Sequence, residues 1–583
     1  MKPYGKLAGA FLGLICVLAF FVGLGAYPLL DPGDGYFAEA SREMLRRGEL
    51  VVPYLNGQIY FSKPIMIYWL IMGSYKTLGV SEFAARLPSA LLASLSVLLT
   101  FTMADRVKGA RAGLLAALVL ASSPLFCTFG RMCLVDMAFT AWLTAALAAT
   151  LLTLSRGGGR QWVWIYIALA AAVLTKGPAA VVMFAGAIAF FAVVQRIPVR
   201  VLFSELRVVP GLAVTSLLSV PWFIAVGLAT DWLWPKVFLL FENLGRFEGE
   251  TNHVNKNPFF YLIVLMYGLF PWTLIAPGLL GWLRRQVVDN RLICLLVCWV
   301  LAVVGAFTLS STKLQTYILP AFPAIAVLFG IAIDGWLSDA ARWRKRANTP
   351  SFAFAANVLG AFGVVSLVVS GLLAVSVATG IFPIPDPGLT TGLKAATAAV
   401  LFVCGVLAVG QMVLHHRGAK PMWAKAFVVA NSAFVVLTVG VVFEVAYDYS
   451  QLDLHRAIQP LIGHDWSNAD VAIYQHFKPG TMFYLQHSVD SFFHADALQS
   501  VAKGERFTQY VLATDKQAPD LVASTAGRMQ PVNQTGHWIL LRSDSMRLKR
   551  LPTLEWTFRN HVSLSTKGVH WGTLPFAGAG RTL

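Results

Sequence analysis

Two acidic residues of this 583-residue chain stand where they could act on a substrate. Asp34 lies in a Gly33-Asp34-Gly35 turn, and glycines allow a backbone to come close to a ligand. Asp136 opens a long apolar stretch shortly after Arg131. Each acid could instead cap the helix that follows it, which leaves the role of Asp34 open, whereas for Asp136 we predict both a cap and a site residue. We treat Asp34 and Asp136 as the candidate catalytic carboxylates.

Several cations in other polar segments have the chemistry of phosphate ligands. Lys63 stands between an aromatic pair and Pro64. Such a lysine can simply extend to the membrane surface, but its ammonium also suits a lipid phosphate. Arg246 and Lys313 can offer a forked or a point-charge contact to phosphate oxygens, and Tyr317, one turn after Lys313, could donate a hydrogen bond. We predict that Lys63, Arg246, Lys313 and Tyr317 bind a lipid-linked phosphate.

The remaining candidates complete a substrate cavity, which we predict to be lined by Tyr36, Arg131, Lys176 and Glu242. Carboxylates suit a sugar hydroxyl, an amine or a general-base role, and cations suit a phosphate, so the combination predicts transfer from a lipid-phosphate donor. The chain has neither a P-loop nor a Rossmann fingerprint. Its six cysteines form no CxxC, and no metal-ligand spacing is strong. We therefore predict no required cofactor, while a divalent metal ion stays open.

The rest of the chain has the composition of a membrane protein. Hydrophobic residues make up 57% and charged residues 13%, against about 45–50% and about 25% in soluble proteins. These values exclude a soluble enzyme, a disordered chain and a fibrous repeat. A helix needs about 20 apolar residues to cross a bilayer. The apolar stretches predict thirteen spans, near residues 8–30, 88–105, 110–127, 136–154, 162–175, 178–195, 207–229, 259–281, 291–309, 315–335, 352–380, 394–414 and 424–447.

The distribution of charge predicts the orientation of these spans. A net charge of +17 would suggest a nucleic-acid partner in a soluble protein. With the N-terminus in the cytoplasm, however, every predicted inward loop is basic, as the positive-inside rule requires. The charge then reflects orientation and contacts with anionic membrane lipids, and no nucleic acid is predicted. The candidate residues fall on the outward side, where several loops can build one active site, whereas a transporter would place its polar residues within the spans.

The spans divide the chain into two predicted domains. Residues 1–447 form a membrane domain whose first loop, 31–87, faces outward and contains a short helix in the membrane interface at 64–80. Residues 448–583 are less apolar and lie outside. Short apolar stretches at 471–474, 482–485 and 537–541 predict strands, and about 135 residues are enough for a small α/β domain with its own core.

A series of motifs along residues 35–335 resembles the multi-spanning GT-C glycosyltransferases, in the branch of the bacterial aminoarabinose transferases of lipid A (the ArnT type) and the protein O-mannosyltransferases. The thirteen spans and the outer domain also resemble the ArnT architecture. The motifs are Ala38-Glu39, Ser41-Arg42-Glu43-Met44, Val52-Pro53-Tyr54-Leu55-Asn56-Gly57, Tyr60-Phe61-Ser62-Lys63-Pro64, Tyr68-Trp69, Phe83-Ala84-Ala85-Arg86-Leu87-Pro88, Asp136, Thr175-Lys176-Gly177-Pro178, Glu242, Arg246-Phe247, Pro258-Phe259, Lys313-Leu314 and Tyr317-Ile318-Leu319-Pro320.

The resemblance implies a fold, a reaction and a location. The fold is an α-helical GT-C membrane domain in the bacterial inner membrane, with the active site and the C-terminal domain on the periplasmic side. The donor would be undecaprenyl phosphate carrying aminoarabinose or a related sugar, and the acceptor a lipid A phosphate or another envelope glycan. An inverting displacement would release undecaprenyl phosphate. Lys63, Arg246, Lys313 and Tyr317 would bind the donor phosphate, and Asp136 would line the cavity near the sugar or the acceptor.

The chain departs from the family pattern in the first loop. Where the family has two successive acids and then, after one more residue, an arginine, this chain has Gly33-Asp34 and Tyr36. Asp34 would then take over the carboxylate role. The family's acid before the lipid-binding lysine is Ser62 here, and the histidine of its Glu-His pair is Asn243. The lipid-phosphate contacts are retained, whereas the contacts to sugar and acceptor differ, which leaves another sugar or acceptor open.

Two other functions also stay open from the sequence. One is a transporter of lipid-linked sugars, although no inverted repeat or broken mid-span helix is evident. The other is a binding protein that has lost its catalytic activity, which the altered first loop motivates.

Overall fold

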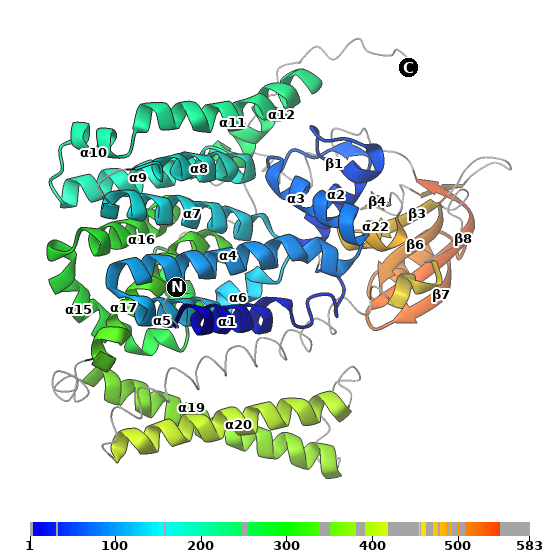
Figure 1. The fold of residues 1–583 in the computed structure, drawn as a ribbon. Helices are drawn as coiled ribbons and strands as arrows, with labels where there is room; N and C mark the ends of the chain where they lie inside the picture. Colours follow the sequence, from blue (N-terminus) through cyan, green and yellow to red (C-terminus); the bar gives the residue numbers. More distant parts are fainter. Residues whose placement is uncertain are drawn as a thin grey trace.

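Long helices run side by side through most of the chain, and a β-sheet of C-terminal residues lies beyond one end of them, with the helices of the first loop in between (Figure 1). A computed structural model describes residues 4–30, 33–156, 159–245, 255, 257–338, 350–379, 391–417, 454, 456–461, 470–475, 478–486, 489–492, 498–500 and 508–548. The predicted span 424–447, the predicted domain boundary after residue 447 and Arg246 lie outside these residues.

The helical body is formed by α-helices and by short π- and 3-10-helices, which are labelled η. In chain order they are α1 (Tyr4–Cys16), η1 (Val17–Phe21), α4 (Glu82–Lys108), α5 (Ala110–Ala121), α6 (Pro124–Gly130), α7 (Val135–Arg156), α8 (Trp162–Lys176), α9 (Ala179–Val194), α10 (Val199–Glu205), α11 (Val208–Ala229), α12 (Leu233–Val237), η2 (Phe238–Gly245), α14 (Phe260–Gly268), η3 (Trp272–Ile275), α15 (Ala276–Asp289), α16 (Arg291–Leu309), η4 (Gln315–Ala321), α17 (Phe322–Ser338), α19 (Pro350–Thr379) and α20 (Thr391–His416).

Five helical segments of the described chain are long and apolar enough to cross a membrane: α4, α7, α11, α16 and η4 with α17. The number rises to seven if two bent helix pairs each count as one span. Each of the first twelve predicted spans coincides with described helix. Several of these helices, such as α8 and α9, are shorter than a full span, so the total of thirteen stays a prediction.

The two bent pairs correct the expectation of continuous helices at 110–127 and 259–281. The axes of α5 and α6 differ by 71°. At this break the hydroxyls of Ser122 and Ser123 donate to the carbonyls of Leu118 and Val119, and Pro124 has no N–H to continue the helix. The second pair, α14 with η3 and α15, is bent by 107° next to Pro271. Broken helices do occur in this chain, which its sequence did not indicate.

Small residues let the helices of the body approach one another closely. A Cβ added at Gly330 of α17 would lie 2.5 Å from the backbone nitrogen of Ala116 in α5. Such contacts replace the hydrophobic driving force that is missing between helices in lipid. At the end of the bundle away from the first loop, Asp334 of α17 pairs with Arg111 and with Lys108, the latter at 3.4 Å. The ion pairs fix α4, α5 and α17 together.

The first loop folds into a layer of its own. It contains α2 (Gly33–Arg47), a hairpin of β1 (Tyr54–Leu55) and β2 (Gln58–Ile59), and α3 (Met66–Leu78). Helix α3 confirms the short helix predicted at 64–80. The apolar side chains of this layer share a core with Trp222, Trp234 and Phe238 from the α11–η2 segment. This core attaches the first loop to the end of the helical body.

The C-terminal residues form a six-stranded sheet in the order β4-β3-β6-β8-β5, with β7 also paired to β8. β3 is parallel to β4 and β6, whereas β8 is antiparallel to β5, β6 and β7. The elements are η5 (Gln459–Leu461), β3 (Asp470–Tyr474), α22 (Pro479–Leu485), β4 (Asp490–Phe492), β5 (Leu498–Ser500), β6 (Thr508–Thr514), α23 (Ala518–Ser524), β7 (Gln530–Thr535) and β8 (Trp538–Leu548). β3 and β8 confirm the strands predicted at 471–474 and 537–541.

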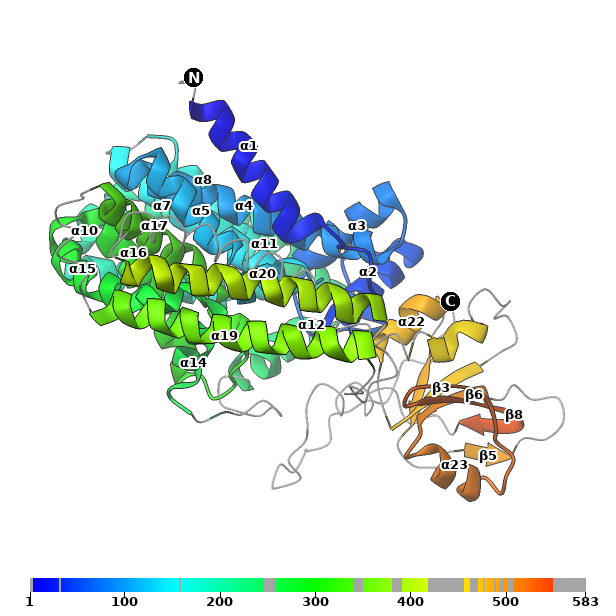
Figure 2. The ribbon, with the colours of Figure 1, turned by 90° about the horizontal axis from the view of Figure 1, so that it is seen from below.

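The third predicted strand, at 482–485, is wrong, because these residues belong to helix α22. Pro479 occupies the first turn of this helix, where its missing N–H has no cost. A short run that is apolar on all sides fits a buried helix as well as a strand. Here α22 is covered on two sides, since it lies between the sheet and α2 of the first loop (Figure 2).

Candidate active site

An ion pair joins the first turn of α7 to the end of α8. The Lys176 ammonium lies 2.5 Å from Oδ1 of Asp136, and both side chains are only 12% exposed. The same ammonium lies 4.3 Å from the ring centre of Tyr317 and 5.2 Å from that of Phe139. The carboxylate and the aromatic faces together hold the cation in one position. Three residues predicted separately, Asp136, Lys176 and Tyr317, are thus in direct contact.

Tyr317 and Lys313 come from the segment that leads into η4. The ring of Tyr317 packs on Phe307, with centroids 5.0 Å apart. Lys313 is buried, and its ammonium donates to the carbonyl oxygen of Ser310 at 2.6 Å. The segment therefore holds a buried cation, Lys313, and four residues later a tyrosine whose ring lies next to the Lys176 ammonium.

A second ion pair joins the first loop to η2. The Lys63 ammonium lies 2.9 Å from Oε2 of Glu242 and donates to the carbonyl of Ser62 at the same distance. Trp234, just before η2, donates its indole N–H to the carbonyl of Tyr60 at 3.0 Å. This bond fixes the chain just after β2, three residues before Lys63. Lys63 and Glu242, which are 179 residues apart in the sequence, are thereby held close together.

The two ion pairs belong to neighbouring elements. Gly177, directly after Lys176, approaches η2 so closely that an added Cβ would lie 2.7 Å from the ring of Phe238. Phe238 is the first residue of η2, which holds Glu242. Lys176 and Glu242 are therefore attached to elements in direct contact, at the end of the bundle that faces the first loop.

Tyr36 lies next to the Lys63 segment. Its ring is stacked on Tyr60 at 5.8 Å with an interplanar angle of 13°. Tyr60 is buried, whereas Tyr36 is half-buried. Tyr36, which stands in place of the family's arginine, therefore adds an uncharged aromatic ring that stacks on Tyr60, three residues before Lys63.

Asp34 is enclosed within the fold. It is fully buried and bound to the equally buried Arg86, whose Nε and Nη2 donate to Oδ2 at 2.9 and 2.8 Å. Oδ1 accepts from the backbone N–H of Cys133 at 2.7 Å. Both oxygens are engaged and neither faces solvent. Asp34 fastens α2 to α4 and to the segment before α7, so this geometry favours a structural role over the catalytic role expected from the sequence.

Arg131 is also turned away from the ion pairs. Its Nη2 donates to the carbonyl of Val22 at 2.7 Å, and its Nη1 donates to that of Ala19 at 3.4 Å. These carbonyls lie in η1 and just after it, so a buried Arg131 binds the end of this helix. The expectation that it lines a substrate cavity is not supported by this placement.

Arg86 is the residue that sequence reasoning missed. It stands inside a motif that was used only for the resemblance, yet it makes five hydrogen bonds, to Asp34 and to the carbonyls of Leu24, Tyr27 and Pro28. The available signal was an arginine two positions before the predicted span 88–105, close enough to the membrane for its charge to need a partner. Among the described residues, no group of three or more His, Cys, Asp or Glu side chains could hold a metal ion.

Comparisons with known proteins give this site a context. The family model "Dolichyl-phosphate-mannose-protein mannosyltransferase" matches residues 62–224. An undecaprenyl phosphate-alpha-4-amino-4-deoxy-L-arabinose arabinosyl transferase of Pectobacterium carotovorum is 35% identical over 347 residues, 58% of this chain and 61% of that protein. The match therefore spans less than two thirds of this relative's length. The protein of the same name from Aeromonas hydrophila is 32% identical over 401 residues, 67% of this chain and 70% of that protein.

The fold has a solved counterpart as well. ArnT from Cupriavidus metallidurans, crystallised with undecaprenyl phosphate, superposes with a TM-score of 0.73 over 92% of this chain and 98% of that one. The sequence identity is 21%, so this likeness shows a shared GT-C fold. The Aeromonas relative shows that the chain belongs to the family of the undecaprenyl phosphate-aminoarabinose arabinosyl transferases.

Proposed function

We propose that the protein is an inner-membrane glycosyltransferase that moves aminoarabinose or a related sugar from undecaprenyl phosphate to a lipid A phosphate on the periplasmic side. The observation that carries the proposal is the pair of nearly buried ammonium groups, Lys63 and Lys176, each held by a carboxylate on neighbouring elements. A site for two phosphates needs two such cations. The names of the relatives supply the donor and the sugar.

Lys63 is the proposed ligand of the donor phosphate. In the present structure Glu242 serves as its counter-ion. A bound phosphate would take over this ammonium as a charge-assisted partner, together with Arg246 and Lys313. Charge that develops on the departing undecaprenyl phosphate would then be stabilised by cations in a site shielded from water.

Asp136, Lys176 and Tyr317 are the proposed reaction centre. A lipid A phosphate is already an anion at neutral pH, so it needs orientation and charge neutralisation rather than a strong base. Asp136 would orient the Lys176 ammonium towards it. A phosphate oxygen of the acceptor would bond to the anomeric carbon while the bond from that carbon to the undecaprenyl phosphate oxygen breaks, with inversion.

Transfer of another sugar, or to another envelope glycan, is the second candidate. It is favoured by the stacked pair of Tyr36 and Tyr60, because Tyr36 places an uncharged aromatic ring where the family has an arginine. A proposed orientation accompanies both candidates, with the N-terminus in the cytoplasm and the C-terminal sheet in the periplasm.

Mass spectrometry of envelope glycans from cells with and without the gene tests the proposal. We expect a lipid A species that carries an added aminopentose and disappears with the gene. An unchanged lipid A together with a change in another glycan would favour the second candidate. Movement of lipid-linked sugar across vesicles by purified protein without any acceptor would favour a transporter.

A further inference from the structure

The turn of the first-loop hairpin is bonded to the C-terminal sheet. Asn56 and Gly57 connect β1 and β2 with φ of +56° and +79°, which is the usual setting of an Asn-Gly hairpin. The side-chain amide of Asn56 is not needed for this turn. It donates to the carbonyl of Val489 at 2.7 Å and accepts the N–H of Val489 at 3.0 Å. Val489 directly precedes β4, the edge strand of the sheet.

The same turn is bonded to α2 on its other side. The backbone N–H of Gly57 donates to Oε1 of Glu43 at 2.9 Å. Glu43 also pairs with Arg47. A two-residue turn therefore connects the C-terminal sheet to a helix of the first loop, and the strand that leaves this turn leads to Lys63.

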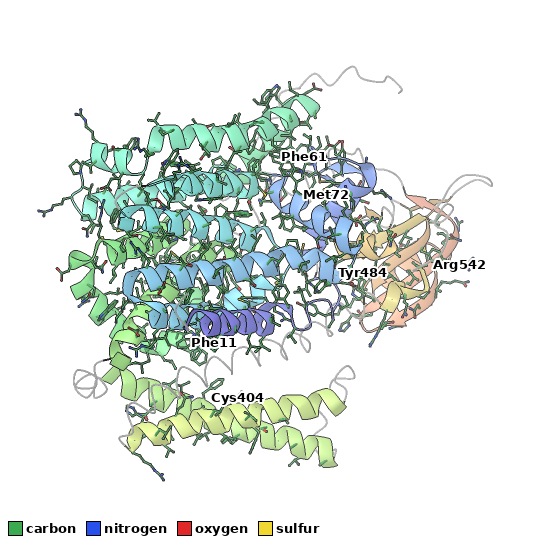
Figure 3. The ribbon with its side chains drawn as sticks, viewed as in Figure 1. Phe11, Phe61, Met72, Cys404, Tyr484 and Arg542 are labelled. Atoms are coloured by element: carbon green, nitrogen blue, oxygen red, sulfur yellow. The ribbon has the colours of Figure 1, made fainter. Side chains whose placement is uncertain are left out.

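A second contact fixes the beginning of the first loop. The backbone N–H of Leu29 donates to the hydroxyl of Tyr484 in α22 at 2.7 Å, where Figure 3 shows Tyr484 at the junction between the sheet domain and the first-loop helices. The neighbouring Phe483 packs on Tyr75 of α3 and belongs to the first-loop core. Tyr484 is half-buried, and the loss of solvent around its hydroxyl raises its pKa, so the hydroxyl stays protonated.

We propose that the C-terminal domain is a clamp for the first loop, and that Asn56 and Tyr484 are positioning residues for the lipid-phosphate site. The two contacts hold Leu29 and the hairpin turn, which are the two ends of the segment that carries α2. The second end continues through Tyr60 to Lys63. The inference rests on the proposed function only in assigning a phosphate to Lys63, since the clamp itself is independent of it.

Two single substitutions release the clamp without removing a packed side chain. Asn56→Asp keeps a residue that tolerates a positive φ but loses the N–H that donates to Val489. Tyr484→Phe removes the hydroxyl that accepts from Leu29. Asn533→Asp is the matched control, because the Asn533 amide donates to the carbonyls of Arg456 and Ala457 within the C-terminal region and not to the first loop.

The experiment combines hydrogen exchange of residues 29–63 with binding of undecaprenyl phosphate, on the full-length protein in detergent. We expect both clamp variants to exchange about two- to ten-fold faster in this segment and to bind the lipid about two- to ten-fold more weakly, the range set by one lost hydrogen bond. Asn533→Asp should change neither quantity. Amounts of folded protein are compared first, because a purely structural role would lower yield and leave lipid affinity unchanged.

The outcomes separate the clamp from the proposed function. Unchanged exchange in Asn56→Asp and Tyr484→Phe would overturn the clamp. Faster exchange with unchanged lipid affinity would overturn the positioning role. A wild-type protein that does not bind undecaprenyl phosphate would remove the proposed function, while the exchange comparison would still decide on the clamp.

Discussion

At the scale of single residues, the two candidate carboxylates have opposite environments. Asp34 is fully buried and forms an ion pair with the equally buried Arg86. Asp136 retains some exposure and holds a lysine that also faces an aromatic ring. A carboxylate whose oxygens are all engaged within the fold is suited to structure, whereas one that orients a partly exposed cation is suited to a substrate. We therefore propose Asp136, rather than Asp34, as the carboxylate that acts in the reaction.

Substitution by asparagine distinguishes the two roles. Asp34→Asn leaves the Arg86 charge buried without a counter-ion, which typically costs about 3–5 kcal/mol, so we expect a large drop in the unfolding temperature in detergent. Asp136→Asn should lower that temperature much less and abolish sugar transfer. An Asp34→Asn protein that is as stable as wild type yet inactive would restore Asp34 as a catalytic residue.

Lys63 gives a second prediction at this scale. Lys63→Ala should weaken binding of undecaprenyl phosphate roughly ten-fold or more, because a charged hydrogen bond to phosphate contributes about 1.5–3 kcal/mol. Lipid binding to the purified protein measures this change. Lys76→Ala is the matched control, since Lys76 is exposed in the last turn of α3. Equal affinity in the two variants would remove Lys63 from the lipid site.

The residue types of the site could be predicted from sequence, but their pairing could not. Asp136, Lys176 and Tyr317 were each named as polar residues on the outward side, and the structure brings them together. The ion pair of Asp34 could not be predicted, because its partner Arg86 is 52 residues away in α4. Sequence position alone does not reveal whether an acid near a glycine turn has a buried arginine as counter-ion.

At the scale of elements, the site depends on the turn between α8 and α9. Gly177 has φ +76° and ψ −147°, a conformation that is essentially restricted to glycine. The turn presses against Phe238 and thereby places Lys176 beside η2. Gly177 and Pro178 at the junction of the predicted spans 162–175 and 178–195 are typical of a turn. The bends in 110–127 and 259–281 were not evident from the sequence, because a hydropathy pattern does not report the direction of a helix axis.

Gly177→Ala tests this arrangement. The added methyl group would both strain the backbone and overlap with Phe238, so we expect a loss of about 1–3 kcal/mol in stability and a strong loss of transfer activity. Gly186→Ala is the control within α9, because an added Cβ there meets nothing within 4 Å. Thermal unfolding and transfer assays of both variants check the prediction. Normal activity in Gly177→Ala would show that the site does not need this turn.

At the scale of the whole molecule, the proposed orientation places the site, the first loop and the C-terminal sheet on one side of the membrane. The first loop and the C-terminal sheet lie at the same end of the helical body (Figure 1), and the first loop contributes Lys63 to the site. The helical membrane fold was predictable because hydropathy and basic loops follow directly from the physics of the bilayer. Docking of the C-terminal domain on the first loop was not predictable, since its contacts join residues more than 400 positions apart.

Labelling of introduced cysteines tests the orientation. Arg528→Cys, at an exposed position of the C-terminal domain, should react with a membrane-impermeant maleimide in spheroplasts. Arg200→Cys, at an exposed position of α10, should react only after permeabilisation. The background should be low, because five of the six native cysteines are buried. If Arg200→Cys were labelled in intact spheroplasts and Arg528→Cys were not, the orientation would be the opposite of the one proposed.

The most direct test of the central claim is sugar transfer by the purified protein. Wild type, Asp136→Asn and Lys63→Ala are incubated with undecaprenyl phosphate-aminoarabinose and lipid A, and both lipids are followed by mass spectrometry. We predict that wild type adds one sugar to lipid A for each undecaprenyl phosphate released, and that each variant is slower by roughly 100-fold or more. Transfer by both variants at the wild-type rate would contradict the account.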